Sequence, residues 1–169
     1  MKYGISDVYA LKTATQEWVS DPDFIGDNTD KATIVLSAKA VNLLHKCVKS
    51  KNLEYLVLAQ ALLNLITELK GSAPASGTEH LYANVMENIF MSKEAHGLLV
   101  AKGILFQQKL SYIGNLKDIE DEMMSLGIYP YNEKKDSNYY IDNDIKNEMV
   151  KLSKQKGRFT YLSTKVNKI

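Results

Sequence analysis

Apolar residues recur along almost the whole chain with the period of an α-helix. Within residues 30–49 they return every three or four positions, as on one face of an amphipathic helix. This period and the turn residues between the periodic stretches predict about six to seven helices, at residues 6–19, 30–49, 53–69, 78–90, 92–112, 116–126 and 141–155. The sequence contains no βαβ pattern and no glycine-rich phosphate loop after a strand. The pattern therefore predicts an all-α helical bundle.

Individual residues set the expected helix ends. Ser6 is expected to be the N-cap of the first helix, Ser92 to begin the fifth, and Gly127 to follow the sixth as its C′ glycine. The helix at 53–69 carries apolar residues on most sides, which is typical of a helix in the middle of a bundle. Two segments are expected to lie outside the helices: a loop at 129–140 and a short extended tail at 158–166.

Composition fits one globular domain over residues 1–169, with 45% hydrophobic and 24% charged residues. The net charge is +1, from 21 basic and 20 acidic residues, so neither nucleic acid nor an anionic membrane is expected as a partner. The amino-terminal residues lack the apolar core of a signal peptide, and no stretch approaches the ~20 apolar residues that cross a bilayer. We therefore expect the cytoplasm. The single Cys47 excludes an internal disulfide and a cysteine-based zinc site, and its apolar helical context predicts a buried, inert thiol.

The three histidines are the first candidates for chemistry. His45 has no partner signal around it and is interpreted as an ordinary helix residue. His80 and His96 lie sixteen positions apart, near the starts of two consecutive helices that should pack antiparallel, and small residues flank both. Two imidazoles and a carboxylate with open positions would form a catalytic type of metal site, for zinc or ferrous iron. The spacing alone does not choose between such a site and two ordinary histidines on packed helices.

A family resemblance adds to these observations. The segments SAPASGTEH (residues 72–80) and HGLLVAKG (residues 96–103) look like the metal-binding signature of sn-glycerol-1-phosphate dehydrogenases. These enzymes belong to the superfamily of iron-containing alcohol dehydrogenases, glycerol dehydrogenases and dehydroquinate synthases. The stretch Gly4-Ile5-Ser6-Asp7 resembles the Gly-x-x-Asp context of the family, and the tail at residues 158–162 resembles its Arg-aromatic-Thr-Ile-Leu end. The resemblance implies a fold like the helical carboxyl-terminal domain of iron-containing alcohol dehydrogenases.

The resemblance implies a three-ligand metal site made of Asp7, His80 and His96. Zinc is favoured over iron or nickel as the metal. Without the resemblance, Asp7 reads as a first-turn acid favoured by the helix dipole. Glu79, next to His80, is interpreted either as a partner of that histidine or as a solvated residue.

The resemblance also implies substrate-binding roles for Ser76, Gly77 and Asn84, although a loop-and-cap role explains Ser76 and Gly77 equally well. The family usually has a second histidine where this chain has Asn84, whose amide can hydrogen-bond a polyol or phosphate oxygen but cannot act as an acid or base near neutral pH. Leu98 stands where many members of the superfamily have Glu, and Ala73 stands where the glycerol-1-phosphate enzymes often have Arg.

Family enzymes also have an amino-terminal Rossmann-like half that binds NAD(P), and this sequence matches only the half that follows it. We therefore expect a truncated or split metal-dependent dehydrogenase domain, inactive alone, whose family reaction interconverts dihydroxyacetone phosphate and sn-glycerol 1-phosphate. NAD(P) is expected only with a separate nucleotide-binding half. The expected partners are a small polyol phosphate and either a Rossmann-like subunit or further copies of the chain. The alternative is a non-catalytic helical module for oligomerisation or subunit docking; a sugar-phosphate cyclase relative fits the motifs less well.

Overall fold

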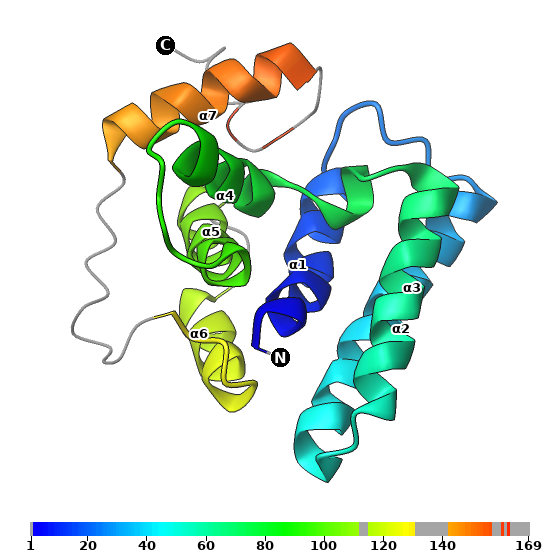
Figure 1. Ribbon diagram of the computed structural model, residues 1–169. Coiled ribbons are helices and arrows are strands. Elements are labelled where there is room, and N and C mark those ends of the chain that lie inside the picture. The colour runs from blue at the N-terminus through cyan, green and yellow to red at the C-terminus, as the bar shows by residue number, and fades with distance from the viewer. Residues whose placement is uncertain (1, 112–114, 131–141, 157–159, 161, 163–169) are drawn as a thin grey trace.

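A computed structural model describes residues 2–111, 115–130, 142–156, 160 and 162. Within these residues every regular element is helical, so the expected all-α fold is confirmed (Figure 1). The elements are α1 Lys2–Val19, α2 Asn28–Ser50, α3 Glu54–Lys70, the short 3₁₀ helix η1 Ala73–Ala75, α4 Thr78–Asn88, α5 His96–Ser111, α6 Leu116–Ser125 and α7 Asn143–Lys156. None of the described helices combines the length and the apolar character needed to cross a membrane.

Helix α1 lies at the centre of the fold, between the α2–α3 pair on one side and α4 and α5 on the other (Figure 1). It is buried nearly all round, and Val8, Tyr9, Ala10, Leu11 and Ala14 are all completely buried. The two alanines let the neighbouring helices approach the α1 backbone closely. Because α1 is held on several sides, any side chain that it contributes to a site is held firmly as well.

Helix α3 lies on the outside, so the expectation that it occupies the middle of the bundle is wrong. It packs mainly on α2, and only Ala59 and Ile66 are buried. Val57 is 68% exposed and Leu58 is 52% exposed. The apolar composition of α3 indicates that the helix favours contact with an apolar surface. It does not indicate whether that surface belongs to the core of this chain or to another molecule.

Some expected helix ends differ from those observed. Helix α1 begins at Lys2, so Ser6 is not its N-cap but a buried residue within it. Helix α5 begins at His96 rather than Ser92, because residues 89–95 form an irregular connection in which Met91 has a φ of 52°. Gly127 follows α6 with a φ of +69°, which confirms it as the C′ glycine.

The remaining helix ends lie close to their expected positions. Helix α2 starts at Asn28, two residues early, because Asp27 and Asp30 form a capping box. Cys47 is 5% exposed, so its expected burial is confirmed. The expected loop at 129–140 and extended tail at 158–166 lie outside the described residues, apart from residues 129, 130, 160 and 162.

Helices α4 and α5 pack closely on each other, and α7 packs across α4. Glu87, near the end of α4, contacts His96 at the start of α5, whereas Glu79, near the start of α4, lies against Gly103. This order of contacts confirms the expected antiparallel pairing. A Cβ atom on Gly103 would lie 2.3 Å from the backbone oxygen of Glu79, so the absence of a side chain there allows the close approach.

Candidate metal site

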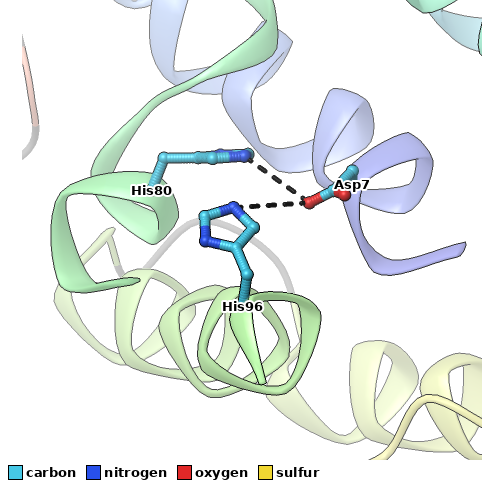
Figure 2. A group of neighbouring side chains, drawn as sticks. All are labelled: Asp7, His80 and His96. Carbon is cyan, nitrogen blue, oxygen red and sulfur yellow. Dashed lines mark ion pairs between the residues drawn. The ribbon is translucent and has the colours of Figure 1, made fainter. Parts of the chain in front are cut away.

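Asp7, His80 and His96 come together at one place in the fold, from helices α1, α4 and α5 (Figure 2). One ligand atom from each residue lies within 4.8 Å of the other two. The Nε2 atoms of His80 and His96 lie 3.7 Å and 3.8 Å from Oδ1 of Asp7. The structure therefore brings together the three residues that the family resemblance implies as ligands.

Each histidine is oriented by a carboxylate on its other ring nitrogen. Oε1 of Glu79 lies 2.9 Å from Nδ1 of His80, and Oε1 of Glu87 lies 2.8 Å from Nδ1 of His96. A carboxylate at Nδ1 favours the tautomer with the proton on Nδ1, which leaves the lone pair on Nε2. Both lone pairs are then available on the side where Asp7 lies. Such carboxylate–histidine pairs are typical of metal-ligating histidines.

The environment of Glu79 decides between its two interpretations. The residue is fully buried, so the solvated interpretation is wrong. Its Oε1 also accepts a hydrogen bond of 2.7 Å from the backbone nitrogen of Gly77. Glu79 is thus held from one side by the backbone and contacts His80 from the other.

Asp7 is a partly buried carboxylate that lies near both imidazoles. Burial raises the pKa of its carboxyl, His80 and His96 oppose this rise, and Glu87 adds to it. Its Oδ1 atom is buried and has no hydrogen-bond partner among the described residues. Two imidazole nitrogens and one carboxylate oxygen are the ligand types that Zn²⁺ accepts. The side chain of His96 is 44% exposed, which leaves one side of the cluster open to solvent.

The three expected substrate-binding residues lie close to this cluster along the chain. Ser76 and Gly77 connect η1 to α4, and Asn84 lies one turn after His80 on α4 and is partly exposed. Gly77 also has a packing reason to be glycine, because a Cβ atom there would lie 2.2 Å from Oε2 of Glu17. Roles for these three residues in substrate binding stay a prediction.

His45, which the sequence analysis interprets as an ordinary helix residue, has a hydrogen-bond partner in the structure. Its Nε2 lies 2.8 Å from Oε1 of Glu122 on α6, and Glu122 also accepts hydrogen bonds from Tyr9 and Lys12 on α1. The side chains of Lys12, His45 and Glu122 line a pocket of about 300 Å³, together with other residues of α1 and α2. No local pattern in the sequence indicates this group, because its members lie on three helices that are separated along the chain.

Sequence reasoning also missed Glu87, Glu17 and Gln107. For Glu87 a signal was present, since a residue seven positions after His80 lies on the same face of the same helix. Glu17 and Gln107 join helices through buried hydrogen bonds over 61 to 94 positions, and no local pattern reports such contacts.

Three known proteins that are similar to this chain have the same name. The sequence is 30% identical over 132 residues to glycerol-1-phosphate dehydrogenase [NAD(P)+] of Sulfurisphaera tokodaii, and 28% identical over 132 residues to that of Sulfolobus acidocaldarius. It is 26% identical over 136 residues to the enzyme of Staphylothermus marinus. No protein-family model matches the chain.

These matches cover most of the chain but only part of each relative. The match to the Sulfurisphaera tokodaii enzyme takes in 74% of this chain and 37% of the relative. The match to the Staphylothermus marinus enzyme takes in 76% of this chain and 38% of the relative. The resemblance inferred from the motifs is confirmed: the chain is similar to glycerol-1-phosphate dehydrogenases and spans less than two fifths of their length.

Proposed function

We propose that this chain is the metal-binding helical part of a polyol-phosphate dehydrogenase that resembles glycerol-1-phosphate dehydrogenase. The observation that carries the proposal is the convergence of Asp7, His80 and His96, with both histidine Nε2 atoms within 3.8 Å of the same carboxylate oxygen. A divalent metal, with Zn²⁺ favoured over iron or nickel, would be held by these three side chains. When bound, such a metal acts as a Lewis acid that polarises an alcohol or carbonyl oxygen.

The residues of the chain have separate tasks in this proposal. Glu79 and Glu87 orient the two imidazoles through hydrogen bonds at Nδ1. The exposed side of His96 gives a substrate access to the cluster. Asn84 supplies an amide that can hydrogen-bond a polyol or phosphate oxygen, in place of the acid–base group that the family usually has there.

NAD(P) would be held by a nucleotide-binding part that the described residues do not form. The described residues contain no strand, whereas the Rossmann fold binds dinucleotides at the edge of a parallel sheet. We therefore propose that reduction of dihydroxyacetone phosphate to sn-glycerol 1-phosphate, the reaction implied by the resemblance, needs this part in addition to the present chain.

Metal analysis tests the proposal directly. The full chain is purified without added metal, and its metal content is compared with that of a His80→Ala/His96→Ala double variant. A His45→Ala variant is the control, because His45 lies outside the cluster. Near-stoichiometric metal in the wild-type and control proteins and a sharp fall in the double variant would support the proposal. Equal trace metal in all three proteins would reject it.

A second candidate function, a helical docking module without catalysis, is favoured by the surface of α3. Five exposed apolar residues follow one another at intervals of four along that helix and its start: Leu53, Val57, Ala61, Leu65 and Leu69. A row at this spacing forms a ridge that suits packing against another helix. Sedimentation of the metal-free chain tests this candidate, since a concentration-independent monomer would count against it.

A further inference from the structure

Glu17 is a buried glutamate that lies outside the proposed ligand set but contacts the elements that carry it. It lies on the last turns of α1 and is 1% exposed. Its Oε2 accepts a hydrogen bond of 2.6 Å from the backbone nitrogen of Thr78, and its Oε1 accepts one of 2.5 Å from the Thr78 hydroxyl. Oε2 also accepts a hydrogen bond of 2.9 Å from Nε2 of Gln107.

These contacts join the same three helices that supply the proposed ligands. Glu17 and Asp7 both lie on α1, Thr78 lies two residues before His80 on α4, and Gln107 lies on α5, which begins with His96. Gln107 strengthens the link between α1 and α5, because its Nε2 also donates to the backbone oxygen of Thr13 at 3.2 Å.

The contact at α4 replaces a missing cap. Gly77 is the N-cap residue of α4 and has no side chain with which to accept a hydrogen bond from the first turn. Glu17 supplies this acceptor from α1, and its negative charge is favoured by the positive end of the α4 dipole. The fit at Gly77 is so close that a Cβ atom there would lie 2.2 Å from the Glu17 carboxylate.

The start of α4 is in turn connected to His80. The backbone nitrogen of Gly77 donates to Glu79, and the same oxygen of Glu79 lies 2.9 Å from Nδ1 of His80. A shift of the Gly77–Thr78 backbone away from Glu17 would therefore move the carboxylate that orients His80. Because Glu17 and Glu79 are both fully buried, water cannot easily replace a lost partner.

We propose that Glu17 is a positioning residue of the metal site, which holds α4 and α5 against α1 so that His80 and His96 face Asp7. This inference rests on the proposed metal function. It assigns a role to a residue that would contact neither the metal nor the substrate.

The test compares the metal affinity of Glu17→Gln with that of the wild-type full chain, by competition of Zn²⁺ against a chelator. Glutamine keeps the size of the side chain but places an NH₂ group where one carboxylate oxygen accepts a hydrogen bond. We expect the dissociation constant to rise about 10-fold, which is the lower end of the range for groups that hydrogen-bond metal-ligating histidines directly. The matched control is Glu122→Gln, since Glu122 also joins helices through three side-chain hydrogen bonds, but these go to residues of α1 and α2 rather than to α4 or α5. A dissociation constant for Glu17→Gln within twofold of wild type would overturn the proposal.

Two further measurements keep the test decisive. If Glu17→Gln does not fold, Thr78→Val takes its place, because it removes only the hydroxyl contact. At least about threefold weaker binding is then expected, as for the loss of one hydrogen bond. Unchanged binding overturns the proposal. Imidazole ¹⁵N spectra of the metal-free proteins separate this inference from the metal function. If Glu17 positions His80, the His80 signals of Glu17→Gln change while those of His45 do not. Unchanged His80 signals would overturn the positioning role, and absence of metal binding by the wild type would reject the metal function alone.

Discussion

Glu87 lies 2.8 Å from the imidazole of His96, although nine positions and an irregular connection separate the two residues in the chain. Glu87 also contributes to raising the pKa of Asp7, so its charge acts on two of the three proposed ligands. Both ends of α4 therefore contribute to the site: His80 lies near the start of the helix and Glu87 near its end.

Replacing Glu87 by Gln should weaken metal binding by about 10- to 100-fold, because the amide orients His96 less firmly than the carboxylate does. Chelator competition with Zn²⁺ measures the change. Glu94→Gln is the matched control, since Glu94 pairs with Lys102 rather than with a ligand. Equal affinities for the two variants would contradict the role given to Glu87.

Replacing Asp7 by Asn should have opposite effects on binding and on stability. Loss of the carboxylate should weaken metal binding by more than about 100-fold, a larger loss than that from an outer partner. Because burial raises the pKa of Asp7, its charged form is disfavoured by folding at neutral pH, and removing the charge should raise the free energy of unfolding of the metal-free protein. Urea unfolding at pH 7 in the presence of a chelator measures this. A less stable variant that still binds metal tightly would refute both expectations.

The helices themselves were predictable from sequence because their signals are local. The period of three to four residues places every α-helix within a few residues of its observed position, and Gly127 marks the end of α6 correctly. The arrangement of the helices was not predictable in the same way. Helix α1 occupies the centre and α3 the outside, because burial depends on which surfaces meet in space.

In the candidate site too, residues that are close in sequence were easier to predict than contacts between helices that are distant in the chain. Spacing alone left His80 and His96 as a weak pair, and the family resemblance was needed to add Asp7 from helix α1. The contacts that orient the histidines come from Glu79, which is adjacent in sequence, and from Glu87, which only the antiparallel packing of α4 and α5 brings close. No sequence pattern indicates the role of Glu17, because its hydrogen-bond partners lie on helices that are distant from it along the chain.

The stability of the protein should fall in acid through the loss of the Glu122 interactions. Burial raises the pKa of the Glu122 carboxyl, but hydrogen bonds from Lys12, Tyr9 and His45 outweigh this and hold the pKa below its ordinary value of 4.5. A group with a depressed pKa in the folded state stabilises the protein above its unfolded pKa, and this stabilisation is lost as the pH falls through the folded value.

Glu122→Gln should therefore be destabilised by about 1–3 kcal/mol at pH 7, the range for hydrogen bonds to a partly buried charged group. The difference from wild type should shrink as the pH falls below 4.5. Urea unfolding across this pH range measures both quantities. A difference that is the same at all pH values would show that the carboxylate charge is not what matters.

The close approach of α4 and α5 can be tested with a single methyl group. In Gly103→Ala the new Cβ atom would lie 2.3 Å from the backbone oxygen of Glu79, and backbone cannot move aside as the end of a side chain can. The helices must separate, which should cost about 1–3 kcal/mol of unfolding free energy, as for other overpacked sites. The shift should also weaken metal binding, because Glu79 orients His80.

Gly4→Ala is the control, since a Cβ atom there meets nothing within 4 Å and an alanine favours the helix by up to about 1 kcal/mol. Urea unfolding should therefore move in opposite directions for the two variants, and a Gly103→Ala protein as stable as wild type would contradict the observed packing.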